Sequence, residues 1–182
     1  MFVRNWMSSP VVTVSPATSA RAALELMTAR NVRRLPAVEG ERLVGIVTKS
    51  DVEAAIGRDH RRGRDKSVAD IMTRDVVSVA PDETLEGAAQ NMLQRRISGL
   101  PVLEAEGVVG IITESDLFRA LCAMLGIGEP SARIVMSVPD SDDLLQALAV
   151  KTQGLELRSM ATYRNLFQNR WEVALRVRST ER

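Results

Sequence analysis

Two seven-residue stretches of the chain carry the same polar side chains at the same spacing. GIVTKSD fills positions 45–51, and GIITESD fills positions 110–116. A threonine where a strand gives way to a helix can cap that helix or bind a phosphate oxygen, because the free N–H groups there add partial positive charge. An ionised aspartate three residues later only accepts hydrogen bonds, which suits two ribose hydroxyls. The candidate binding residues are therefore Thr48, Asp51, Thr113 and Asp116.

The same spacing also has a structural interpretation. In a capping box, the threonine and the aspartate satisfy each other's backbone N–H groups at the start of the helix. Spacing alone leaves the capping box and the ligand site open as alternatives. Gly45 and Gly110 open the two stretches, and a glycine within a strand predicts the close approach of another group to the backbone.

Both stretches belong to a longer internal duplication. When the sequence is shifted by 65 positions, 18 of the 46 pairs between Trp6–Asp51 and Ile71–Asp116 are identical, and no gap is needed. A duplication of this kind indicates one supersecondary unit used twice. Each copy predicts the order β-α-β-β-α, so the fold class is α/β (α+β) with a pseudo-twofold pair.

The first half of each copy sets the expected element boundaries. Short β-branched runs predict strands at 11–14 and 76–79, each running into a turn at a proline. Apolar spacing predicts helices after them, with Thr18 or Ser19 capping the first and Asp82 capping the second.

The second half of each copy predicts a hairpin and a helix. RRLPAV and SGLPVL are followed by apolar runs typical of buried strands. The helices after Asp51 and Asp116 are expected to end at Gly57 and Gly126.

Residues 131–182 do not continue the repeat. They predict a β-α-β-β unit, with Asp140 or Ser141 as the helix cap. In the last strand, apolar and polar residues alternate, so one side should face a core. A unit of this size buries little apolar surface alone, so we expect it to pair with a second copy or pack on the rest of the chain.

Composition excludes several classes of function. The formal net charge of +1 gives no global field toward nucleic acid or a membrane surface, and no apolar run is long enough to span a bilayer. The single cysteine, Cys122, excludes an intramolecular disulfide and fits a cytoplasmic protein. Residues 58–66 hold five basic side chains and the only histidine, His60; they predict a solvated linker, with phosphate contact as the alternative.

The duplicated pattern resembles a known family. LPAV followed by GIVTKSD, and GLPVL followed by GIITESD, resemble tandem CBS (cystathionine-β-synthase) domains, which form a Bateman module. The resemblance covers roughly residues 1–127, with CBS domains expected at 1–57 and 67–127. The opening MFVRNWM and the segment 131–182 look similar to acetoin-utilisation-type regulators, so the resemblance implies an ACT-like unit.

The resemblance assigns roles to particular residues. It implies that Thr48 and Thr113 meet phosphate and that Asp51 and Asp116 meet ribose. Adenine would then stack on Val47 and Ile112, with core packing as the alternative. The flanking positions would be Val12, Val14, Val77, Val79 and the backbone at Arg34–Leu35 and Gly99–Leu100.

The two expected pockets differ in charge. Lys49, Arg33 and Arg34 accompany the first, where the second has Glu114, Ser98 and Gly99. More positive charge should favour polyphosphates, so we expect ATP at the first pocket and AMP or adenosine at the second. The alternative is that these side chains point to solvent.

These observations predict a regulatory sensor of adenine nucleotides (ATP, ADP or AMP) rather than an enzyme. Neither His60 nor Cys122 has the partners of a catalytic or metal site, and no covalent cofactor is implied. The alternatives are a sensor of S-adenosylmethionine or an interaction scaffold without a ligand. An apolar helical face and unpaired sheet edges predict a homodimer that acts on an effector protein, with no nucleic-acid or membrane partner.

Overall fold

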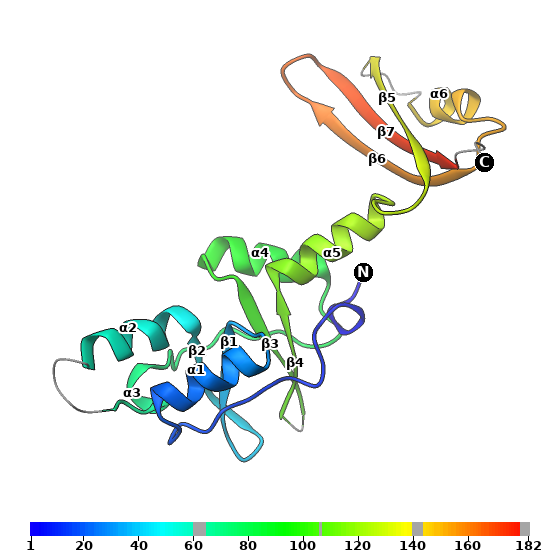
Figure 1. The fold of residues 1–182 in the computed structure, drawn as a ribbon. Helices are drawn as coiled ribbons and strands as arrows, with labels where there is room; N and C mark the ends of the chain where they lie inside the picture. Colours follow the sequence, from blue (N-terminus) through cyan, green and yellow to red (C-terminus); the bar gives the residue numbers. More distant parts are fainter. Residues whose placement is uncertain (60–64, 106, 140–143, 179–182) are drawn as a thin grey trace. The chain divides into compact units, whose positions relative to one another are not determined.

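The computed structural model describes residues 1–59, 65–105, 107–139 and 144–178. They form two compact units, Met1–Leu117 and Phe118–Arg182, which are described separately below (Figure 1). The centre of the predicted linker, with His60, and the predicted caps Asp140 and Ser141 lie outside the described residues.

In the first repeat, two helices cover a β-hairpin. The first helix begins where predicted, because the Ala22 N–H donates to the Ser19 Oγ at 3.2 Å. The helix after the hairpin runs past Gly57, so the predicted end at this glycine is wrong by two residues. The elements are η1 (Val3–Asn5), α1 (Ala20–Ala29), β1 (Arg34–Glu39), β2 (Arg42–Thr48) and α2 (Lys49–Asp59).

The second repeat has the same arrangement. Its first long helix begins one residue after Thr84, whose Oγ1 accepts the Gly87 N–H at 3.0 Å, so the predicted cap Asp82 is wrong. Gly126 has a φ of +63° just beyond the final helix, as expected for a helix end. The elements are α3 (Val68–Ile71), α4 (Leu85–Arg95), β3 (Gly99–Glu104), β4 (Gly107–Thr113) and α5 (Glu114–Met124).

The predicted strands at 11–14 and 76–79 reduce to one-residue contacts. Val14 forms an isolated parallel bridge with Ala37, and Val79 forms the equivalent bridge with Val102. The chain turns at a proline two residues later in each repeat, so a longer ladder cannot form.

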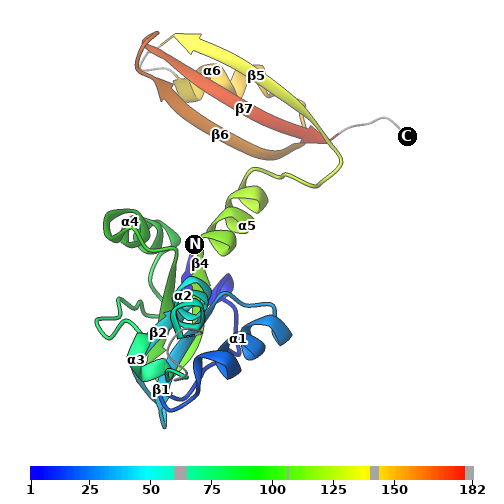
Figure 2. The ribbon, with the colours of Figure 1, turned by 60° about the vertical axis from the view of Figure 1, so that its left-hand side comes forward.

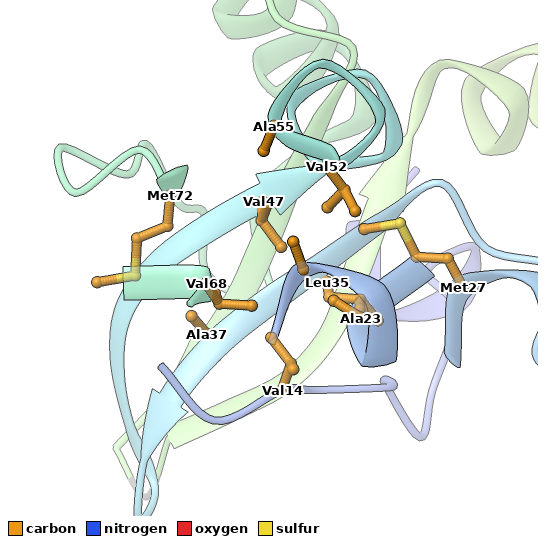
Figure 3. Close-up of a cluster of buried hydrophobic side chains, with 11 residues drawn as sticks. Val14, Ala23, Met27, Leu35, Ala37, Val47, Val52, Ala55, Val68 and Met72 are labelled. Atoms are coloured by element: carbon orange, nitrogen blue, oxygen red, sulfur yellow. The ribbon is translucent and has the colours of Figure 1, made fainter. Parts of the chain in front are cut away.

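One core of the first repeat lies between its hairpin and its helices. Figure 3 shows Leu35 and Val47 from the hairpin gathered with Met27 of α1 and Val52 of α2. Val68 and Met72, which come after the linker, belong to the same buried cluster. The first repeat therefore uses side chains from the start of the second repeat to fill its core.

Each repeat also makes backbone hydrogen bonds to the hairpin of the other repeat. Ser8, from the start of the first repeat, bonds in both directions with Ile111 of β4, at 2.9 and 3.1 Å. Thr73, from the start of the second repeat, bonds in the same way with Ile46 of β2, at 2.9 Å each way. Each hairpin therefore gains an extra edge contact from the other repeat.

This exchange explains the two glycines that open the repeated stretches. A Cβ at Gly45 would lie 2.4 Å from the Met72 Sδ, and a Cβ at Gly110 would lie 2.6 Å from the Met7 Sδ. Both glycines permit the close approach that the sequence predicted, and the approaching group is a segment of the other repeat.

The second unit holds the predicted β-α-β-β segment as a three-stranded antiparallel sheet in the order β5-β7-β6. Figure 2 shows α6 lying against one face of this sheet. The core of this face contains Val138, Leu148, Val173 and Leu175. The elements are β5 (Ser131–Pro139), α6 (Leu144–Lys151), β6 (Leu157–Asn165) and β7 (Arg170–Arg178).

Candidate functional site

In the first repeat, the polar residues of the repeated stretch form a capping box. β2 ends at Thr48 and α2 begins at the next residue, so the threonine stands at the N-cap. Its N–H and its hydroxyl both donate to the Asp51 Oδ2, at 3.0 and 2.6 Å. The Asp51 N–H donates back to the Thr48 Oγ1 at 3.3 Å.

The second repeat brings the equivalent pair together in the same way. The Thr113 N–H and hydroxyl donate to the Asp116 Oδ2, at 2.8 and 2.6 Å. The capping alternative is thus present in both repeats, and it uses the Oδ2 oxygen of each carboxylate. Capping holds the threonine and the aspartate together at the N-terminal end of a helix, where an anion is favoured.

The two carboxylates differ in exposure. Asp116 is only 1% exposed, whereas Asp51 is half-buried. Within the described residues, the Asp51 Oδ1 has no hydrogen-bond partner. Every buried side-chain oxygen and nitrogen among these residues does have a partner, so the Asp51 Oδ1 is not one of the buried atoms. This oxygen is therefore open to solvent and can accept a hydroxyl without breaking the cap.

The side chains predicted to stack on adenine lie in the core. Val47 and Ile112 are both 0% exposed, so their side chains have the core packing that was kept as the alternative. The flanking residues Val14, Val79 and Gly99 are also buried, and Val12 and Val77 are half-buried.

Arg34 connects the two repeats. Its backbone pairs with Thr48, but its guanidinium donates from Nη2 to the Ser98 Oγ. A Cβ on Gly99 would meet the Arg34 Cδ at 3.2 Å and the Thr113 Cγ2 at 3.3 Å. The side chain therefore lies beside the capped threonine of the second repeat.

The electrostatic surroundings of Arg34 agree with this position. Burial lowers the pKa of Arg34 from its ordinary value, Glu114 raises it, and Arg33 lowers it. Glu114 immediately follows Thr113, so a carboxylate of the second repeat acts on a guanidinium of the first. The sequence comparison of the pockets assigned the charge of Arg34 to the first repeat. In the structure this charge lies beside residues of the second repeat.

The other two basic residues predicted for the first pocket lie near the surface. The Lys49 Nζ is 3.8 Å from the Glu53 Oε1, one helical turn away, and the two side chains are 44% and 56% exposed. Arg33 is also exposed. Their positions agree with the alternative that these charges face solvent.

Sequence reasoning missed Ser98 as the partner of Arg34. The sequence does contain a signal for this contact, because Arg34 and Gly99 occupy equivalent positions in the duplication. A pseudo-twofold axis brings equivalent residues near it into contact, and a long side chain opposite a glycine fills the vacant space.

The described residues hold no cluster of acidic, histidine and cysteine side chains that could bind a metal ion. Over the same residues, the helices are too short or too polar to span a bilayer. Cys122 is a free, half-buried thiol on α5.

The family model for the CBS domain matches twice, at residues 3–58 and 68–123. The chain belongs to the CBS domain family. The two matches cover more than half of the sequence, and each contains one of the two hairpins.

Two relatives of known sequence contain a segment similar to this CBS pair. The chain is 36% identical over 117 residues to the CBS domain-containing protein YhcV of Bacillus subtilis, covering 63% of this chain and 81% of YhcV. It is 38% identical over 108 residues to inosine-5'-monophosphate dehydrogenase of Thermoplasma acidophilum, covering 59% of this chain and 21% of the enzyme. The match thus spans about a fifth of that dehydrogenase, in which the CBS pair is one part of a larger protein.

Solved CBS pairs have the same fold. The putative acetoin utilization protein AcuB from Vibrio cholerae has a TM-score of 0.64 and 30% identity, over 70% of this chain and 96% of that one. CBSX2 in complex with AMP has a TM-score of 0.59 and 30% identity, over 66% and 95%. The CBS pair of MJ0100 in complex with 5'-methylthioadenosine and S-adenosyl-L-methionine has a TM-score of 0.59 and 30% identity, over 66% and 95%.

Proposed function

We propose that the CBS pair is a regulatory module that binds an adenine nucleotide (ATP, ADP or AMP) and transmits occupancy through its conformation. The observation that carries this proposal is the open Oδ1 of Asp51 beside a capped helix N-terminus. A ribose hydroxyl can donate to this oxygen while Oδ2 keeps the cap. The AMP complex of CBSX2, a similar CBS pair, supports adenosine as the shared chemical group.

We further propose that the two sites rank phosphates in the opposite order to the one expected from sequence. Arg34 lies beside Thr113 of the second repeat. Its equivalent in the second repeat is Gly99, which has no side chain that could lie beside Thr48 of the first repeat. A ligand at the second site has to draw Arg34 away from Ser98, and a phosphate supplies the replacement partner because charged hydrogen bonds to guanidinium are strong. Adenosine without phosphate offers no such partner.

S-adenosylmethionine is the second candidate ligand. Glu114 is exposed next to Thr113 and could attract the positive sulfonium or amino group of this molecule. The similar CBS pair of MJ0100 was solved with S-adenosyl-L-methionine, which supports this class of ligand.

We propose that the chain is a sensor without catalytic activity, and that it acts as a homodimer on an unidentified effector protein. α5 carries Phe118, Leu121 and Met124 as exposed apolar side chains at helical spacing, a surface that a partner would cover. The boundaries 1–57, 58–66, 67–127 and 131–182, and the ACT-like character of the last segment, remain part of this proposal.

Calorimetric titration with AMP, adenosine and S-adenosylmethionine tests the site assignment. Asp51→Asn and Asp116→Asn should each weaken adenosine-ligand binding by about 10- to 100-fold, since hydrogen bonds to a charged group are worth ~1.5–3 kcal/mol. If neither substitution alters binding of any of the three ligands, the proposed function is wrong.

The chain offers a matched control for the loss of a cap. Ser67 and Asp70 form a third capping box, in which the Ser67 N–H and Oγ donate to the Asp70 Oδ2 at 2.9 and 2.8 Å. Asp70→Asn removes a carboxylate of the same geometry outside the repeated stretches. It should leave every ligand affinity unchanged, so a comparable loss in this variant would assign the effect to folding.

A further inference from the structure

The two edges of the sheet in the second unit are built differently. On the β6 edge, the register shifts between Leu157 and Ser159, and Arg158 and Arg164 add charge. Irregularity and charge are devices that protect an edge strand from pairing with other chains. On the β5 edge, all nine residues Ser131–Pro139 pair with β7 without a shift, so this edge is long and regular.

β5 also exposes apolar side chains on both of its faces. Ile134 is 36% exposed on the side that carries α6, and Val135 is 53% exposed on the opposite side. β5 thus has an exposed apolar side chain on each face and lies at an edge of the described sheet.

We propose that β5 pairs antiparallel with β5 of a second copy of this chain, with the two-fold axis at Val135. Residues opposite each other in a ladder must point to the same face, so only alternate registers are possible. Of these, the register centred on Val135 pairs all nine residues and makes a continuous six-stranded sheet. It places Arg133 of one copy opposite Ser137 of the other.

Charge complementarity supports a second copy as the occupant. Ser137 donates from Oγ to the Glu172 Oε1 at 3.0 Å, so these residues form one row across the sheet. Arg133 of the second copy would extend this row next to Ser137, within reach of Glu172. Neither Arg133 nor Glu172 forms an ion pair among the described residues of its own chain.

The same register gives Arg133 an acidic neighbour that it lacks among the described residues of its own copy. Within one copy, Arg133 lies directly opposite Arg176, and like charges in this position are destabilising. Pairing offers Arg133 a carboxylate on its other side, and symmetry provides this contact twice. Arg170 donates to the Ser137 Oγ at 2.8 Å and to the Ser137 carbonyl oxygen at 3.1 Å, so in the paired sheet Glu172 would have both Arg170 and Arg133 of the second copy nearby. Among the described residues, the Glu172 Oε2 has no hydrogen-bond partner.

This inference deepens the homodimer proposed above and does not depend on the identity of the ligand. Cysteine crosslinking in the full chain tests the register, in a Cys122→Ser background that removes the native thiol. Opposed residues of an antiparallel pair have Cα atoms about 4.5–5.5 Å apart, within the range a disulfide requires. Val135→Cys should therefore give a covalent dimer under mild oxidation, by non-reducing electrophoresis.

Tyr163→Cys is the matched control, since Tyr163 is 63% exposed on β6 at the protected edge. It should crosslink at least about tenfold more slowly, because no opposed copy holds two thiols within disulfide range. Light scattering on the parent chain separates the two proposals. A monomer overturns the homodimer and this inference together, whereas a dimer in which Val135→Cys crosslinks no faster than Tyr163→Cys overturns only the pairing of β5.

Charge reversal provides a second readout without cysteine. Arg133→Glu and Glu172→Arg should each raise the dimer dissociation constant by about three- to tenfold, and the double variant should restore it, as expected for cross-strand ion pairs. Additive losses in the double variant would overturn the proposed register.

Discussion

The two CBS repeats cap equivalent helices, α2 and α5, with the same pair of side chains, but they differ in what surrounds the cap. In the first repeat, the carboxylate of Asp51 is half-buried and keeps one oxygen free. In the second, Asp116 is buried, and Arg34 of the other repeat lies beside Thr113. A duplication therefore preserves the local geometry of a site while changes at the pseudo-twofold axis make the two sites unequal.

The largest difference should appear in folding stability. Asp116→Ala should lower the free energy of unfolding by ~2–3 kcal/mol, because it removes a buried carboxylate to which the Thr113 N–H and hydroxyl both donate. Asp51→Ala should cost about 1 kcal/mol, as is usual for the loss of a more exposed cap. Urea unfolding of both variants measures this contrast, and equal losses would show that burial does not separate the repeats.

The next effect concerns ligand choice. Arg34→Gln should reduce the ratio of AMP affinity to adenosine affinity by about tenfold, since one guanidinium contact to phosphate is lost, worth ~1.4 kcal/mol. Arg33→Gln changes the neighbouring, exposed arginine and should leave the ratio unaltered. Calorimetry should be done at about 50 mM and about 500 mM salt. The effect of Arg34→Gln on the affinity ratio should persist at the higher concentration, because salt screens a partly buried side chain less than an exposed one. If the ratio of AMP affinity to adenosine affinity is unchanged in Arg34→Gln, the phosphate preference must come from the flanking surface charges instead.

A smaller effect should come from the position equivalent to Arg34. Gly99→Ala adds a Cβ 3.2 Å from the Arg34 Cδ, and we expect a loss of about 0.5–1 kcal/mol because the side chain must shift. In an Arg34→Ala background the same change should be nearly neutral, so the two substitutions should be coupled. Thermal unfolding of the four chains measures this coupling, and simple additivity would mean that Arg34 does not occupy the space above Gly99.

The smallest effect is expected at Lys49. Lys49→Met breaks an exposed pair with Glu53 and should change stability by less than about 0.5 kcal/mol. It should also leave ATP affinity unchanged, because the side chain faces solvent. A clear loss of ATP binding in this variant would support the charge contrast that the sequence first suggested.

The sequence predicted the repeat, the hairpins and the polar pair at each helix start, because these depend on local spacing. Ser19 was recognisable as a cap since it directly precedes an apolar helical pattern, whereas several polar residues compete before α4 and Asp82 was chosen in place of Thr84. The short strands at 11–14 and 76–79 were overestimated, since β-branched composition does not show how soon the chain turns.

The side chain of Arg34 could not be placed from sequence. Its neighbours are set by the packing of one repeat on the other, and its backbone position beside Thr48 suggests the wrong repeat. Likewise, Val47 and Ile112 precede the polar pair in sequence, but strand alternation directs them into the core.

The exchange of segments between the repeats has a consequence for the order in which the chain is made. Ser8 leaves the ribosome before its partner Ile111, which is synthesised about a hundred residues later by the numbering of the chain. The segment around Ser8 cannot dock until nearly the whole unit has been made, so its docking is a late, long-range event that slows folding. We expect a nascent chain halted before β4 to remain sensitive to protease around Ser8, and the released chain to become resistant there in one step.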